Sequence, residues 1–275
     1  MSQTTGCCPL YALDRPIKRD PYSKHIIPHI GAAERSPDNC AKDIEAARAL
    51  NVDATRSLAT LTKDRSIFLI YISTDYVFSG KAGEAPYECD DKPSPTNEYG
   101  QTKLDGEQAV LDVVGDSGQA ICLRVPVLYG SVEEGKNSES AINTLIDTLW
   151  KAQKQSDPIS MDDYSQRYPT NTTDVGKVCL QIAEKYLAVP EGSQERGKNL
   201  PQILHFSSED RMTKYEICEK FSDWMGLSME NIVAKKEGND SKAAAVQRPY
   251  DTHLSTAELK KLGVDVSTIN FELWW

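Results

Sequence analysis

The 275-residue sequence lacks several features that would each point to a particular class of protein. Its longest apolar run, around IFLIYI at residues 67–72, is far too short to span a lipid bilayer. Its first 20 residues contain no apolar core, so we expect no secretory signal peptide. Its net charge is −10, and nucleic acids and anionic membranes would repel such a surface. We therefore expect neither a nucleic-acid partner nor a membrane.

Cysteine and histidine are arranged in ways that argue against a metal site or a disulfide framework. The seven cysteines are scattered, odd in number and contain no C-x-x-C pair, so they predict neither zinc ligands nor disulfides. His29, His205 and His253 have no metal-ligand spacing, and we expect structural roles for them. The sequence thus predicts a cytoplasmic or nuclear protein with reduced thiols and no bound metal.

The sequence also contains no G-x-G-x-x-G or G-x-x-G-x-x-G motif. Turns of that kind hold the pyrophosphate of a dinucleotide against backbone N–H groups at a helix N-terminus. The two G-x-x-G pairs, Gly80 with Gly83 and Gly115 with Gly118, do not lie between a strand and a helix of the required kind. The usual anion site of a dinucleotide-binding domain is therefore missing from these 275 residues.

The elements that are present alternate between strand and helix. β-branched and aromatic runs predict strands over 26–30, 66–73 and 119–130, although Pro28 weakens the first of them. Apolar residues at helical spacing predict helices over 43–64 and 97–114. This order is typical of an α/β fold with a parallel sheet and right-handed crossovers.

The C-terminal half has a different pattern, which predicts a second, smaller lobe. Residues 141–154 form an amphipathic helix whose apolar face we expect to pack in a core. Thr213 with Glu216, and Ser255 with Glu258, have the spacing of helix capping boxes, and a glycine follows each of these short helices.

Tyr99 and Lys103 lie four residues apart and so share one face of the helix predicted over 97–114. A free tyrosine titrates near ~10, and a neighbouring ammonium group lowers that pKa. Tyr99 could then donate a proton to a carbonyl oxygen as hydride reaches the carbonyl carbon. A hydroxyl of the preceding strand, from Thr74 rather than Ser73, could bind the same oxygen. Many helices carry Y-x-x-x-K by chance, and a solvated lysine beside a half-buried tyrosine is the alternative.

Longer motifs surround these residues and resemble a known family. The motifs ISTDYVFSG, YGQTKLDGEQAV, LRVPVLYG and QRPYDTHLSTAELKKLG resemble the extended short-chain dehydrogenase/reductase superfamily and, more narrowly, its dTDP-4-dehydrorhamnose reductase (RmlD-like) family. Within that family, GAAERSPD, LNVDAT, QRYPTNTTDVG and MTKYE are most similar to the regulatory beta subunits of methionine adenosyltransferase. The resemblance runs from about Ile26 to the C-terminus.

The resemblance implies a truncated Rossmann-like parallel sheet, without the family's first strands and glycine-rich turn, and a small C-terminal α/β lobe. We expect an irregular leader over 1–24 and a partial NAD(P)-binding domain over 25–130, to which 165–190 returns. Residues 131–275 would form mostly the lobe that binds substrate in the family.

The resemblance also implies roles for matching positions. Thr74, Tyr99 and Lys103 would be catalytic, and Asn51 would support the lysine. The positions that would contact the cofactor are Gly31, Ala32, Ala33, Arg35, Asn51, Tyr99, Lys103, Pro126 and Leu128. The positions outside the catalytic three also have structural explanations, such as close packing of small residues, a surface charge or a backbone bridge, and the sequence leaves both open.

Two arginines and a tyrosine in the C-terminal half could belong to a substrate site. In the reductases of the family the equivalent cleft binds a nucleotide-sugar, and Arg167 or Arg248 could hold its diphosphate, with Tyr168 beside them. Each arginine could equally tie a loop to the sheet through carbonyl oxygens.

The family carries its glycine fingerprint well before the position of GAAER, and only about 30 residues precede that segment here. We expect the first βαβαβ portion to be absent, which would turn the strand at 26–30 into a sheet edge. NADP is the cofactor of the family, and we expect this chain to bind it weakly or not at all.

Two functions are compatible with these features. The first is a non-catalytic regulatory subunit that binds the catalytic subunit of methionine adenosyltransferase and modulates S-adenosylmethionine synthesis. Trp274 and Trp275 could anchor such an interface, or they could cover the chain's own lobe. The second is an NADP-dependent reductase that acts on a keto group of a nucleotide-sugar, which the set of Thr74, Tyr99 and Lys103 favours.

Overall fold

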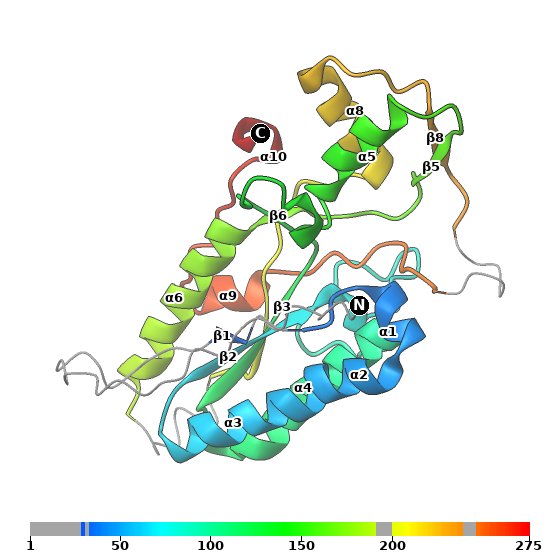
Figure 1. Ribbon diagram of the computed structural model, residues 1–275. Coiled ribbons are helices and arrows are strands. Elements are labelled where there is room, and N and C mark those ends of the chain that lie inside the picture. Colours follow the sequence, from blue (N-terminus) through cyan, green and yellow to red (C-terminus); the bar gives the residue numbers. More distant parts are fainter. Residues whose placement is uncertain (1–28, 31–32, 191–199, 239–245) are drawn as a thin grey trace.

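The computed structural model describes residues 29–30, 33–190, 200–238 and 246–275 of the chain (Figure 1). The predictions for the leader at 1–24, for most of the strand at 26–30, and for Gly31 and Ala32 lie outside these ranges. The described strands are β1 (His29–Ile30), β2 (Leu69–Thr74), β3 (Ala120–Val125), β4 (Leu128–Tyr129), β5 (Ile159–Asp162), β6 (Thr170–Asn171), β7 (Ile203–His205) and β8 (Ile232–Lys235). The described helices are α1 (Pro37–Lys42), α2 (Ile44–Arg48), α3 (Thr55–Asp64), α4 (Glu98–Val114), α5 (Thr144–Ala152), α6 (Thr172–Ala188), α8 (Lys214–Met225), α9 (Ala257–Lys261) and α10 (Phe271–Trp274).

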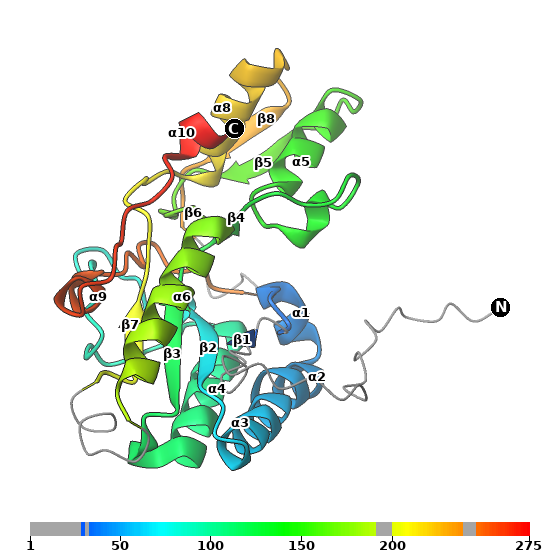
Figure 2. The ribbon, with the colours of Figure 1, turned by 90° about the vertical axis from the view of Figure 1, so that its left-hand side faces the viewer.

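A four-stranded parallel sheet forms the centre of the larger part of the molecule. Its strand order is β1-β2-β3-β7, and α3 and α4 cover one face while α6 covers the other (Figures 1 and 2). The α/β fold class with a parallel, Rossmann-like sheet is thereby confirmed.

The alternation of side chains along the strands explains why both faces are covered. In β2, Leu69 and Tyr71 pack with α3 and α4, whereas Ile70 packs with Val178 and Ile182 of α6. All four neighbouring positions from Phe68 to Tyr71 are buried, which is typical of a parallel strand between two helical layers. β7 joins this sheet and Leu259 of α9 packs in the same core, although the sequence-based division places both segments in the smaller lobe.

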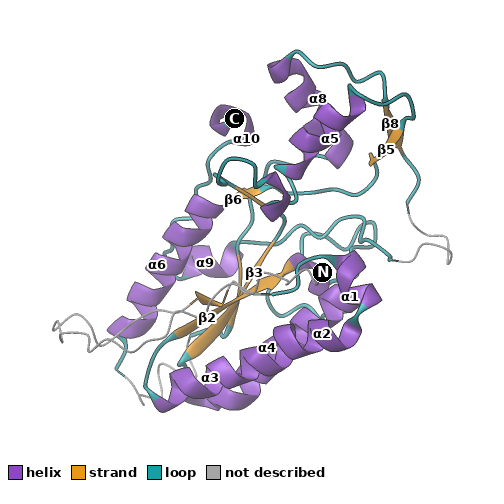
Figure 3. Cartoon of the chain, viewed as in Figure 1, coloured by secondary structure: helices purple, strands orange, loops and turns teal. Residues whose placement is uncertain are grey.

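The smaller lobe has its own core. It contains α5, α8, α10 and a parallel pair of strands, β5 with β8 (Figure 3). Phe221 of α8 and Phe271 of α10 are buried there, and Trp274 and Trp275 pack against the same cluster. These tryptophans therefore cover their own lobe, while Leu273 between α10's aromatic residues is 88% exposed.

Candidate functional site

The end of β2 and the start of α4 bring the predicted catalytic residues into one region. Asn97 caps α4 by accepting a hydrogen bond from Gly100 N at 2.9 Å, which places Tyr99 in the first helical turn. A Cβ at position 100 would lie 2.1 Å from the carbonyl oxygen of Tyr76, so only glycine allows this approach. The rings of Tyr76 and Tyr99 meet edge to face, with their centroids 5.8 Å apart.

Tyr99 is half-buried, and its protonation differs from the prediction. Burial raises the pKa of Tyr99 well above its usual value, and a hydrogen bond with the Thr74 hydroxyl opposes that rise only in part. The expected lowering by Lys103 is therefore wrong for the protein alone, because desolvation of the phenol dominates. Tyr99 is a protonated donor at neutral pH.

Thr74 ends β2 and is nearly fully buried. Its hydroxyl donates to Asp75 Oδ1 at 3.1 Å and accepts from Tyr76 N at 3.2 Å. These two contacts fix the hydroxyl beside Tyr99.

Lys103 is buried between α4 and β2 and has two contacts. Its Nζ donates to the carbonyl oxygen of Ile72 at 2.8 Å and lies 4.0 Å from the centroid of the Tyr71 ring. Burial lowers the pKa of Lys103 to about 8, and the Glu107 carboxylate limits that decrease. An ammonium has three donors, so the bond to Ile72 leaves Lys103 able to bind a further acceptor.

Asn51 contacts the neighbour of the lysine, not the lysine itself. Its amide Nδ2 donates to Thr102 Oγ1 at 3.0 Å and to the carbonyl oxygen of Glu34 at 3.2 Å, and Oδ1 accepts from Glu34 N at 2.9 Å. Asn51 is thus a buried bridge between α4 and the loop after β1. Arg35 in that loop donates to the Glu139 carbonyl oxygen at 2.8 Å.

The remaining predicted cofactor positions that the structure describes follow β1 or β3 in the chain. Ala33 is half-buried, Pro126 is buried directly after β3, and Leu128 begins β4, where it pairs with Thr170. Contact of these residues with a cofactor stays a prediction.

Asp75 is a buried carboxylate beside the site that the sequence analysis did not select, although it directly follows Thr74. Thr252 Oγ1 donates to Asp75 Oδ2 at 2.6 Å, and burial raises the pKa of Asp75. The backbone N–H groups of Tyr250 and Asp251 both donate to the Gly80 carbonyl oxygen at 3.0 Å. The C-terminal segment is thereby tied to the loop that follows β2.

A buried ion pair supports α4 one turn beyond Lys103. Arg124 Nε and Nη2 donate to the two carboxylate oxygens of Glu107 at 2.9 and 2.7 Å, and Ser73 Oγ also donates to Glu107. Both charged side chains are almost fully buried. The signal in the sequence is Glu107 at four residues from Lys103, on the same helix face.

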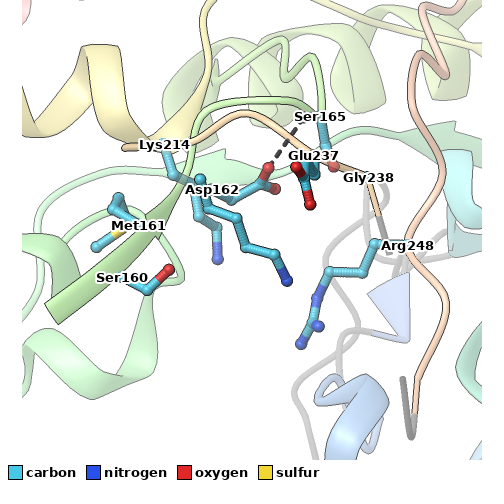
Figure 4. A pocket seen from close by; sticks show the side chains of 9 residues that line it. Ser160, Met161, Asp162, Ser165, Lys214, Glu237, Gly238 and Arg248 are labelled. Carbon is cyan, nitrogen blue, oxygen red and sulfur yellow. Dashed lines mark hydrogen bonds between the residues drawn. The ribbon is translucent and has the colours of Figure 1, made fainter. Parts of the chain in front are cut away.

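The three residues that could hold a diphosphate each have a partner within the chain. Arg167 is buried and donates to the carbonyl oxygen of its neighbour Gln166 and to the Asp162 carboxylate. Tyr168 donates to Asp251 at 3.2 Å. Arg248 makes an ion pair with Asp38 at 2.9 Å and also lines a cavity of about 300 Å³ (Figure 4).

Two classes of site are not found within the described ranges. They contain no group of three or more His, Cys, Asp or Glu side chains that could hold a metal ion. No helix among the same residues is both long and apolar enough to cross a membrane.

A parallel sheet covered by helices on both faces defines a Rossmann-like α/β protein. The model of the RmlD substrate binding domain matches residues 19–271, and the chain belongs to that family.

Relatives and solved structures agree with this assignment. The chain is 40% identical to methionine adenosyltransferase 2 subunit beta of Mus musculus. The alignment covers 90% of this chain and 67% of the mouse protein. It is 39% identical to a Haloferax volcanii protein named as a low-salt glycan biosynthesis reductase, over 98% of this chain and 85% of the other. The fold matches the dTDP-4-dehydrorhamnose reductase of Bacillus anthracis, described in complex with NADP, with a TM-score of 0.71 and 22% identity over 90% of this chain and 77% of that one.

Proposed function

We propose that the chain is a regulatory subunit that binds the catalytic subunit of a methionine adenosyltransferase and modulates S-adenosylmethionine synthesis. The observation that supports this most is the 40% identity to the mouse beta subunit, which extends over 90% of the chain. An alignment over 90% of the chain is too long to be confined to the Tyr99 region or to one lobe.

Co-sedimentation tests this proposal. The chain is mixed with a methionine adenosyltransferase catalytic subunit and analysed by sedimentation velocity, and the rate of S-adenosylmethionine formation is measured with and without it. We expect a stoichiometric complex and a changed rate. Independent sedimentation of the two proteins would contradict the proposal.

A matched pair of surface variants locates the interface. Leu273 of α10 is 88% exposed next to the aromatic cluster, and an exposed apolar side chain of this kind can contribute to a partner contact. We expect Leu273→Asp to weaken the complex about tenfold, or ~1.4 kcal/mol, because the change removes an apolar contact and places a carboxylate in the interface. Leu180→Asp on α6, where the leucine is 57% exposed, is the control and should bind normally.

A second candidate, a reductase of nucleotide-linked keto sugars, is favoured by the geometry around Tyr99. Thr74 and Tyr99 would bind the carbonyl oxygen of the substrate, and protonated Tyr99 would supply the proton as hydride arrives. NADPH oxidation with a 4-keto sugar nucleotide, abolished by Tyr99→Phe, would establish this activity. If the chain forms the complex with the catalytic subunit but does not oxidise NADPH, the result would support the regulatory function and argue against the reductase.

We infer that these 275 residues bind NADP weakly or not at all. Tyr99 and Lys103 fit the nicotinamide ribose end, and the cofactor would supply the hydride. The turn before α1, which lies after the position of the family's glycine motif, does not replace that motif, because the Glu34 carboxylate already accepts the Ser36 N–H there at 2.8 Å. A phosphate at that position would be repelled by Glu34.

A further inference from the structure

Lys214 faces a cavity that the catalytic residues do not share. It is the first residue of α8 and is half-buried. The cavity has a volume of about 300 Å³, and Figure 4 shows Lys214 and Arg248 around the same open space. No described residue forms a hydrogen bond or ion pair with its amine. The other charged residues that line the cavity are Asp162, Lys235 and Glu237.

The surroundings of Lys214 disfavour its charged form. The N-terminus of α8 carries the positive end of the helix dipole, which repels an ammonium group. Burial is the largest effect, and with the guanidinium groups of Arg167 and Arg248 it lowers the pKa of Lys214 to about 8. Asp162 and Cys218 oppose the decrease. The Asp162 carboxylate is partly engaged, since it accepts from Ser165 N at 3.0 Å.

The position of Lys214 is fixed by its neighbours. Met212 and Arg167 exchange two backbone hydrogen bonds of 3.0 Å. Thr213 and Glu216 form a complete capping box, with bonds of 3.1 and 2.7 Å. The start of α8 is therefore fixed against the loop that carries Arg167. A preorganised reactive site requires such a rigid support.

We propose that Lys214 is a nucleophilic amine that forms an imine with a small carbonyl compound carrying a phosphate or carboxylate group. The nitrogen lone pair attacks the carbonyl carbon, the carbon–oxygen π electrons move to oxygen, and one N–H proton passes from the nitrogen to that oxygen; the second N–H proton leaves with the hydroxyl group as water. Loss of water from the resulting carbinolamine leaves the carbon–nitrogen double bond, with no change of oxidation state. A lysine beside other cations is a known route to such a nucleophile.

Arg248 is the partner for the anionic group. Its ion pair with Asp38 is partly exposed, with 29% of the Arg248 side chain and 54% of the Asp38 side chain accessible. Exposed pairs of this kind contribute only about 0–1 kcal/mol, so a bound anion can replace Asp38. This inference does not depend on the proposed regulatory function.

Lys103 provides an internal comparison. Its pKa is also lowered to about 8, but the side chain is only 4% exposed and donates to Ile72. We therefore expect Lys103 not to react with a carbonyl compound, because its amine has a lowered pKa but does not line a cavity. Lys177, which is 61% exposed, represents the ordinary surface lysines.

Labelling with pyridoxal 5′-phosphate and borohydride reduction, followed by peptide mass spectrometry of the full chain, tests the proposal. At pH 7 a lysine of pKa about 8 has roughly two hundredfold more free amine than an ordinary lysine, so substoichiometric reagent should modify Lys214 first. The labelling should rise with pH to a midpoint near 8, and inorganic phosphate should reduce it.

Arg248→Ala should decrease labelling of Lys214, since it removes the anion contact and raises the pKa of the amine. Lys214→Arg should remove the main adduct. Label distributed over Lys177 and other surface lysines according to exposure, or no label on Lys214 in the unmodified chain, would overturn the proposal.

Discussion

His205 shows how two neighbours can determine the protonation state of a buried residue. Its Nε2 lies 3.2 Å from Arg124 Nη1, and its Nδ1 lies 3.2 Å from the carbonyl oxygen of Tyr87. A guanidinium can only donate and a carbonyl can only accept, so Nε2 accepts and Nδ1 donates. The ring is therefore neutral, and burial together with Arg124 lowers the pKa of His205 to about 3.

This arrangement predicts a specific loss of stability in acid. The unfolded chain takes up a proton near pH 6.5, whereas folded His205 does not until about pH 3, so folding becomes less favourable as pH falls through this window. Between pH 6 and 4 the loss of unfolding free energy from His205 should be about 2.5 kcal/mol. Urea unfolding of the wild type and of His205→Gln at several pH values measures it, and equal pH dependence in the two proteins would contradict the assignment.

Single residues also mark the limit of prediction from sequence. The spacing of Tyr99 and Lys103 was sufficient to place both on one helix beside Thr74. The direction of the Tyr99 pKa shift was not predictable, because it depends on burial by residues distant in sequence. For the same reason local spacing did not predict that Arg124 pairs with Glu107, or that Lys214 lines a cavity.

At the scale of elements, the helix predicted over 43–64 divides at Asn51. The structure has α2, a π-helical segment over Ala49–Ala54 and then α3. Asn51 lies in this wider segment, and its side chain donates hydrogen bonds to the Glu34 carbonyl oxygen and to Thr102. Apolar periodicity cannot report such a change, since a single π-helical turn shifts the pattern by only one residue.

Gly106 of α4 lies so close to neighbouring elements that we expect a side chain at this position to destabilise the fold. A Cβ at Gly106 would lie 2.3 Å from Tyr71 Oη and 2.5 Å from the Asn51 carbonyl oxygen. We expect Gly106→Ala to decrease the free energy of unfolding by about 1–3 kcal/mol, the usual cost of overpacking.

Gly176 of α6 is the matched control, because it is exposed and a Cβ there would contact nothing within 4 Å. Gly176→Ala should stabilise the protein by about 0.5–1 kcal/mol through helix propensity. Urea denaturation of both variants checks the pair, and a change of the same sign in both would argue against the described packing.

At the scale of the molecule, the alternation of strands and helices predicted the parallel sheet and the presence of a second lobe. The path of the chain between them was less predictable. β7 and α9 lie in the larger core although they follow segments of the smaller lobe, because long-range pairing with β3 and packing under α6 decide their position.

The central proposal is that Thr74, Tyr99 and Lys103 form a nicotinamide-side site and that these 275 residues hold the pyrophosphate of NADP weakly or not at all. Its most direct test is calorimetric titration of these 275 residues with NADPH. We predict no saturable heat at concentrations on the order of tens of micromolar, because the ribose contacts alone supply too little binding free energy. Saturable binding at or below that concentration would contradict the account.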